Sequence, residues 1–236
     1  MVRKPKAPSL KGKTAADRLR QEIISGVIPE STPLRQSALA RRFRVSIIPI
    51  REAISSLVQE GLAEAIPFRG AVVAKLRPED LLEIARVRIA LEHEALALAY
   101  QGHTRMTLDR CRGLLDKAQT VEGYTQFEYY YEYLMALYEP CGHRFLLSEI
   151  SRLVRLGLRF SILNPAILSA IPSDVPLPRD IFASLDSGNL PLAQEQMRLL
   201  YTHTSILGAS VLYQRDLEAK PKADRPRRRV AGKHVS

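Results

Sequence analysis

With 236 residues, the chain is longer than one typical domain and too short for three, which favours two units of unequal size. Hydrophobic residues make up 46% and charged residues 25%, a composition that excludes a disordered chain. No apolar run is long enough to span a membrane, and the basic start lacks the apolar stretch of a secretion signal, so we expect a cytoplasmic protein. Cys111 and Cys141 form no metal-type pair and are interpreted as packing residues.

The net charge of +10 is unevenly distributed along the chain. Residues 1–78 contain 15 Lys or Arg against 6 Asp or Glu, residues 79–213 contain 12 against 16, and residues 214–236 carry a net +5. Basic ends around an acidic middle favour contact of the ends with a polyanion. A merely solvated tail would explain the end of the chain but not its beginning.

The first third of the chain predicts a small DNA-binding module. Residues 1–13 combine basic residues with Pro and Gly and predict a flexible basic arm. Apolar periodicity predicts helices over 15–25, 35–43 and 47–60, with Ser46 as a candidate N-cap of the third. Segment 62–76 alternates around a Pro-Phe-Arg-Gly turn, which indicates a two-stranded hairpin with a basic tip. Three helices and a hairpin are typical of a winged helix-turn-helix, here over residues 14–77.

The rest of the chain predicts helices. We expect them over 79–100, 106–121, 124–138, 144–163, 178–187 and 190–212, with a loop or broken helix at 164–177. The predicted fold class is therefore mostly α: an N-terminal winged helix-turn-helix with a small β-hairpin wing, and a C-terminal all-α helical bundle over 78–213. Residues 214–236 are expected to be a basic disordered tail. Its arginines would either attract phosphates without reading sequence or simply be solvated: Arg225, Arg227, Arg228 and Arg229.

Candidate DNA-binding residues surround the third predicted helix. A helix in the major groove needs side chains near its N-terminal end that reach bases, and nearby cations that bind phosphates. Arg51 lies one turn into this helix and could reach a phosphate or a guanine edge, while Ser46 could bind phosphate at the helix start. The other candidates are four cations before the helix and the wing tip: Arg35, Arg41, Arg42, Arg44, Arg69 and Gly70. The alternative is that these arginines are ordinary solvated residues.

The run from Leu19 to Val73 resembles the DNA-binding domain of GntR-type bacterial regulators. The family pattern occurs in order, as IISGVIP, LARRF, VSIIPIREA and GLAEAIPFRGAVV. The helices that begin with RVRIALEHEALALA at Arg86 are similar to the all-helical effector domain of the FadR subfamily. The resemblance implies a transcription regulator, a repressor or an activator, that binds double-stranded operator DNA as a homodimer. It also implies that the bundle binds a small-molecule effector such as an organic acid.

Two isoleucines depart from the family pattern at the start of the third helix. The residues after Val-Ser are usually Arg and Thr, and that Arg commonly reads a base, whereas this chain has Ile47 and Ile48. Ile47 is therefore expected to touch a thymine methyl group while Arg51, Arg35 and Arg69 hold the DNA. Otherwise the protein has an unusual operator or weak specificity.

The metal site of many relatives, an Asp and three His, is expected to be lost. The aligned positions hold no ligand atoms of that kind: Tyr130, Leu134, Pro178 and Leu200. A different register could still bring His203 into such a site. Without a metal, polar residues predicted on inner helix faces are candidates for effector binding: Arg88, Tyr130, Arg155, Arg159 and His203. Arginine suits a carboxylate or phosphate, although Arg155 and Arg159 could instead lie on a solvated face.

Two other functions compete with a ligand-responsive regulator. The first is a DNA-binding protein whose bundle only dimerises and senses no ligand. The second is an enzyme with a nucleic-acid-binding appendage. We expect no enzyme, because the sequence contains no Ser/His/Asp constellation, phosphate loop or HExxH spacing, and the segment around Glu92, His93 and Glu94 lacks the second His.

Overall fold

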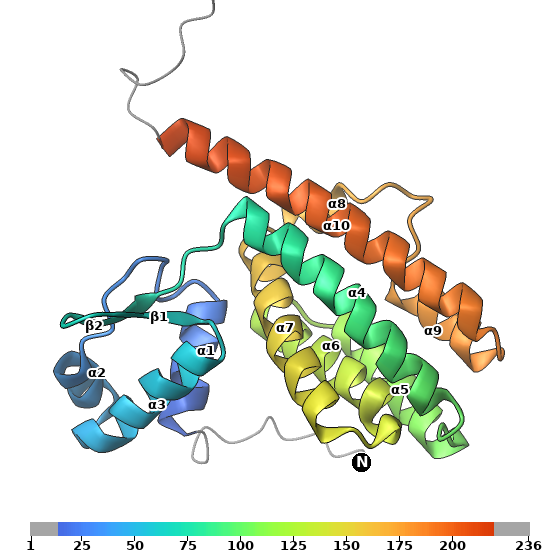
Figure 1. Cartoon of the computed structure of the whole chain (residues 1–236), viewed down its shortest axis with the longest axis horizontal. Helices are drawn as coiled ribbons and strands as arrows, with labels where there is room; N and C mark the ends of the chain where they lie inside the picture. Colours follow the sequence, from blue (N-terminus) through green and yellow to red (C-terminus); the bar gives the residue numbers. More distant parts are fainter. Residues whose placement is uncertain (1–13, 220–236) are drawn as a thin grey trace, which may run out of the picture.

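The computed structural model describes residues 14–219 and has two parts (Figure 1). The N-terminal part is a winged helix-turn-helix: α1 (Ala15–Ile24), α2 (Gln36–Phe43), α3 (Ile47–Gln59), β1 (Ala63–Ile66) and β2 (Gly70–Val73). The remainder is a helical bundle: α4 (Pro78–Tyr100), α5 (Arg105–Gln119), α6 (Gly123–Tyr138), η2 (Glu139–Cys141), α7 (Arg144–Leu163), α8 (Ala166–Ser169), α9 (Pro178–Asp186) and α10 (Leu190–Ala219). The predicted fold class is confirmed.

Local sequence explains the start and the packing of α1. Thr14 caps the helix, since its hydroxyl accepts from the Asp17 amide while the Asp17 carboxylate accepts from the Thr14 amide. Arg20 on the same helix donates two hydrogen bonds of 2.7 Å to Glu60, at the end of α3. Burial by itself would raise the pKa of Glu60, but the hydrogen bonds and charge of Arg20, together with Ser56 and Arg155, hold that pKa below its ordinary value.

The wing is a short antiparallel hairpin in which Ala63 pairs with Val73 and Ile66 with Gly70. Pro33 adds a bridge to Val72, so the segment before α2 lies along the outer edge of β2. The predicted hairpin is present, and the residues between its strands are 67–69.

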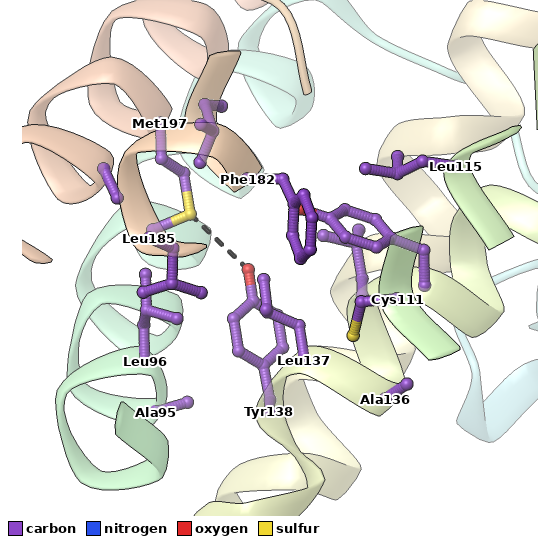
Figure 2. Packing of buried hydrophobic residues seen from close by; sticks show 14 of the residues in the cluster. Ala95, Leu96, Cys111, Leu115, Ala136, Leu137, Tyr138, Phe182, Leu185 and Met197 are labelled. Carbon is purple, nitrogen blue, oxygen red and sulfur yellow. Dashed lines mark hydrogen bonds between the residues drawn. The ribbon is translucent and has the colours of Figure 1, made fainter. Parts of the chain in front are cut away.

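The core of the bundle lies among α4, α5, α6, α7, α9 and α10. Figure 2 shows Phe182 and Leu115 close to Cys111, and the Tyr138 hydroxyl facing Met197, 3.5 Å from its Sδ atom. Burial raises the pKa of the Cys111 thiol to about 11, as expected of a packing residue. In the described part of the chain, no helix is long and apolar enough to cross a membrane.

The structure corrects the expected end of the last helix. We predicted an end at residue 212 and a disordered tail from 214, but α10 continues to Ala219. The extra turns are held by the N-terminal part: Arg215 donates to Glu30 at 3.1 Å and to the Leu76 carbonyl at 3.0 Å, and Lys75 donates to Asp216 at 2.9 Å. Residues 220–236, with the four tail arginines, and the predicted arm 1–13 lie outside the described residues.

The two parts share a hydrophobic cluster. Phe127 of α6 and Leu156 of α7 are buried together with the core of the winged domain, and Ile84 and Ile162 pack against the same cluster. Gly61, after α3, also faces this junction, because a Cβ there would lie 3.4 Å from Leu156. The winged domain is therefore packed directly onto the bundle.

Candidate nucleic-acid interface and ligand cavity

The turn between α2 and α3 gathers arginines on the outside of the winged domain. Arg35 is the residue before α2, Arg41 and Arg42 lie in the last turn of α2, and Arg44 follows with a left-handed φ of 57°. All four side chains are exposed. Arg42 forms an ion pair with Glu22. In contrast, no described residue forms a side-chain hydrogen bond or ion pair with Arg35, Arg41 or Arg44, so the fold leaves these three cations free for an external anion.

The first turn of α3 presents apolar side chains to solvent. Ile47 is 52% and Ile48 59% exposed, whereas Ile50 is completely buried. Arg51 is exposed and has no ionic partner among residues 14–219. Ser46 occupies the predicted N-cap position, but its hydroxyl caps no amide of α3 and remains exposed. Ser46 and these exposed side chains form the end of α3 that a major groove would receive.

The wing tip lies on the same outer side as α2, away from the helical bundle (Figure 1). Arg69 and Gly70 are both exposed there. Gly70 has a φ of +89°, and a Cβ on it would meet nothing within 4 Å. Glycine is therefore required at this position by the positive φ and not by a close neighbour. The nine residues predicted to bind DNA thus lie along α2, the start of α3 and the wing tip.

The bundle contains a cavity of about 560 Å³ whose wall is contributed by α4, α5, α6, α7, α9 and α10. Most of the wall is apolar, and two of the five predicted effector residues, Arg88 and Tyr130, line it. Burial raises the pKa of Tyr130, which therefore stays protonated. Gly157 makes room for the guanidinium of Arg88, since a Cβ at that glycine would lie 3.0 Å from Nη1.

Arg88 is the centre of a buried polar network. Its Nε atom donates to Glu92 at 2.6 Å, its guanidinium stacks on the Tyr201 ring at 4.2 Å, and its Nη2 atom is buried without a partner among the described residues. Tyr138 and Tyr201 each donate to the other oxygen of Glu92 at 2.7 Å. Burial lowers the pKa of Arg88, but Glu92 together with Tyr201 and Tyr130 raises that pKa above its ordinary value, so Arg88 is a permanent cation.

The tyrosines of this network keep their protons. Burial, and then the neighbouring Glu92 carboxylate, raise the pKa of Tyr138 far above its ordinary value. For Tyr201, burial and Glu92 raise the pKa and outweigh the opposing effect of Arg88. Glu92 was considered in the sequence only as part of an incomplete zinc motif. Its spacing of four residues from Arg88, which places both on one helix face, was the signal that could have identified the pair.

The other three predicted effector residues do not line this cavity. Arg155 stacks on the Tyr131 ring at 3.8 Å and borders a separate polar pocket between α7 and the winged domain. His203 is half-buried on α10. Arg159 is only 1% exposed, and its Nε and Nη1 atoms have no partner within the described chain. A solvated face shared by Arg155 and Arg159 is therefore wrong for Arg159.

The positions aligned with metal ligands fall in and near the same cavity. Tyr130, Pro178 and Leu200 line it, and Leu134 is buried in the adjoining core. Within residues 14–219, no group of three or more His, Cys, Asp or Glu side chains is arranged to hold a metal ion. The polar side chains of the cavity wall are two guanidinium groups, the carboxylate of Asp180, two amides and several hydroxyl groups, and Arg88 is the buried cation among them.

Comparisons with known proteins find similarity to bacterial transcription regulators. Residues 11–73 match the model described as "Bacterial regulatory proteins, gntR family". The chain is 28% identical over 190 residues to the "Probable D-xylose utilization operon transcriptional repressor" of Paenarthrobacter nicotinovorans, covering 77% of this chain and 81% of that protein. It is also 28% identical over 159 residues to the HTH-type transcriptional regulator McbR of Escherichia coli (strain K12), covering 64% and 72%.

Solved structures share the arrangement of both parts. A transcriptional regulator (GntR family member) from Pseudomonas syringae pv. tomato str. DC3000 is similar with a TM-score of 0.51 and 25% identity, over 84% of this chain and 86% of that one. E. coli McbR/YncC is similar in fold with a TM-score of 0.62 and 24% identity, over 86% and 96%. The N-terminal domain thus matches the gntR family model over residues 11–73.

Proposed function

We propose that this chain is a DNA-binding transcription regulator whose helical domain responds to a small anionic ligand. The DNA-binding part of the proposal rests on exposed arginines around α2, α3 and the wing tip that make no ion pair within the described chain: Arg35, Arg41, Arg44, Arg51 and Arg69. A fold that needed these cations for stability would have paired them. Relatives named as transcriptional regulators and repressors support the same conclusion.

Apolar contact contributes to sequence reading in this proposal. In the major groove only thymine presents a methyl group, and Ile47 and Ile48 expose side chains of matching character at the start of α3. Arg51, one turn further, reaches a guanine edge or a phosphate, and the arginines of α2 bind flanking phosphates. A half-site containing thymine next to the contact of Arg51 is the expected operator element.

The ligand is an amphiphilic organic acid held by Arg88. The unpartnered Nη2 atom can donate to a carboxylate or phosphate, while the apolar wall suits a hydrocarbon or aromatic body. Because burying an unpaired donor costs free energy, a bound anion would satisfy a group that the protein alone leaves unsatisfied. The residues of the cavity include neither a nucleophile with its base nor a carboxylate pair, so binding without reaction is proposed.

The cavity wall provides the route from ligand to DNA. Phe127 lines the cavity and also belongs to the cluster that packs the winged domain onto the bundle, and Ile84 and Ile162 do the same from α4 and α7. A ligand that displaces Phe127 therefore moves the surface of the bundle against which the winged domain packs. In a homodimer of the FadR type, which we include in the proposal, that shift changes the relative positions of the two DNA-binding domains.

The DNA-binding proposal is tested by fluorescence anisotropy with a duplex from the region upstream of the gene and a scrambled duplex of the same composition. Arg51→Ala with Arg69→Ala is expected to weaken binding to both duplexes and to reduce the salt slope by about 2 if both arginines bind phosphates. The preference for the upstream duplex should also fall if Arg51 reads a guanine edge. Arg198→Ala, on the exposed face of α10 within the bundle, is the matched control and should bind like the wild type. Equal wild-type affinity for both duplexes would contradict sequence-specific binding.

The ligand proposal is tested by thermal unfolding with a panel of carboxylates and phosphates. Stabilisation by at least one of them should be lost in Arg88→Met and retained in Arg198→Ala. If no member of the panel raises the melting temperature of the wild type, the alternative, a bundle that only dimerises, is favoured.

A further inference from the structure

The wing turn holds an exposed aromatic side chain in a conformation that normally requires another residue. The amide of Arg69 donates to the carbonyl of Ile66 at 3.0 Å and closes a turn with Pro67 and Phe68 at its centre. Phe68 has a φ of 60°. Turns with Pro in the second position and a positive φ in the third usually place Gly or Asn in that third position, because a larger side chain adds strain.

Folding offers no reason for this phenylalanine. Its relative exposure is 109%, the highest among the large exposed hydrophobic residues of the described chain, so the ring packs against nothing. Ile66 and Gly70 form the last strand pair, which leaves Phe68 at the far end of the hairpin from the domain core. The left-handed backbone costs stability and the exposed ring contributes none on folding, which is typical of a residue that serves binding.

Charge identifies the partner as nucleic acid rather than an apolar protein surface. Arg69 is adjacent in the chain and exposed, and α2, which carries the exposed Arg41 and Arg42, lies on the same outer side of the domain as the hairpin (Figure 1). With the start of α3 in the major groove, a hairpin beside it meets the next stretch of backbone and the minor groove beyond. Apolar side chains inserted there partly unstack a base step and bend the duplex.

We propose that Phe68 is a wedge that enters the minor groove at a base step flanking the site of α3, with Arg69 bound to the groove edge or adjacent phosphate. The inference rests on the proposed DNA-binding function and deepens it. It adds a second specificity element: pyrimidine–purine steps such as TA and CA unstack most easily, so such a step is expected outside the bases that α3 contacts. The operator is also expected to bend on binding.

The test uses full-length protein and a duplex that the wild type selects from a random-sequence pool. 2-Aminopurine replaces the purine of each flanking pyrimidine–purine step, since its fluorescence rises when it is unstacked. Phe68→Asn is the informative variant, because Asn suits the turn and should leave the melting temperature unchanged or higher. We expect it to lose the fluorescence rise and about tenfold in affinity, roughly 1.4 kcal/mol. Phe68→Leu should keep part of both signals.

Met106→Ala is the matched control, since Met106 is 81% exposed at the start of α5 in the bundle. It should change neither signal. If Phe68→Asn binds with wild-type affinity and an unchanged fluorescence rise, the wedge is wrong while DNA binding stands. If Phe68→Asn alters only the oligomeric state, Phe68 contacts protein and the wedge is equally wrong. If the wild type selects no sequence from the pool, both the wedge and the proposed function fail.

Discussion

Replacing Glu92 with Gln removes the carboxylate that balances a buried cation. The side chains of Arg88 and Glu92 are 9% and 0% exposed, so the remaining guanidinium would stay buried without a counterion. Removing one member of a buried ion pair typically costs about 3–5 kcal/mol. The hydrogen bonds from Tyr138 and Tyr201 would also weaken, because a neutral amide oxygen replaces a charged acceptor. For a chain of this size, we expect the melting temperature to fall by roughly 10 °C.

Denaturant unfolding of four proteins, namely the wild type, Glu92→Gln, Arg88→Met and the double variant, isolates the contribution of the pair. Glu92→Gln should lose about 3–5 kcal/mol, whereas the double change Arg88→Met with Glu92→Gln should recover most of that loss, because no charge remains buried. Glu92→Gln should also bind a carboxylate ligand more tightly than the wild type, since Arg88 then has no internal competitor. A loss below about 1 kcal/mol in Glu92→Gln, or a double variant less stable than either single one, would refute this account of the network.

Three further results are expected. Burial raises the pKa of Glu60, but Arg20 with Ser56 and Arg155 lowers it below 4.5, so these interactions stabilise the fold above pH 4.5 and are lost as the pH falls through the lower folded pKa. Glu60→Gln should therefore reduce the dependence of the unfolding free energy on pH in the acid range, and an unchanged dependence would contradict this. Cys111, whose pKa is about 11, should react with an aromatic disulfide at neutral pH only after urea unfolding, as followed by peptide mapping. Arg215→Met should reduce the effect that the stabilising carboxylate has on operator affinity, as measured by anisotropy. It should not change the affinity for the carboxylate itself, as measured by calorimetry. Arg198→Met should behave as wild type in both measurements.

Local patterns predicted the winged domain well because its signals are local. A glycine follows the end of α1 and of α3, a proline lies in the first turn of α3, and the alternation around Pro67 defines the hairpin. The end of α10 was wrong because residues 214–219 are polar and gain helical structure from partners far away in sequence, such as Glu30. Nothing in a charged, exposed sequence signals such contacts.

The candidate ligand site was only partly predictable. Helical periodicity identifies residues on inner faces but not which of two inner faces borders a cavity. Arg88 and Arg159 have similar sequence surroundings, yet only Arg88 lines the cavity, while Arg159 is buried elsewhere on α7. Phe68 escaped notice because a sequence does not reveal that a turn residue has a positive φ and no neighbours.

The connection between the two domains limits which DNA the proposed dimer can recognise. Only residues 74–77 join β2 to α4, a reach of at most roughly 13–14 Å, and the amide and carbonyl of Leu76 are bound by Glu30 and Arg215. Adding one base pair between half-sites separates them by about 3.4 Å and rotates one by about 35° around the duplex. A tether this short cannot follow that rotation, so half-site spacing should be enforced more strictly than most base identities, and a Gly-Ser insertion after Lys75 should relax it.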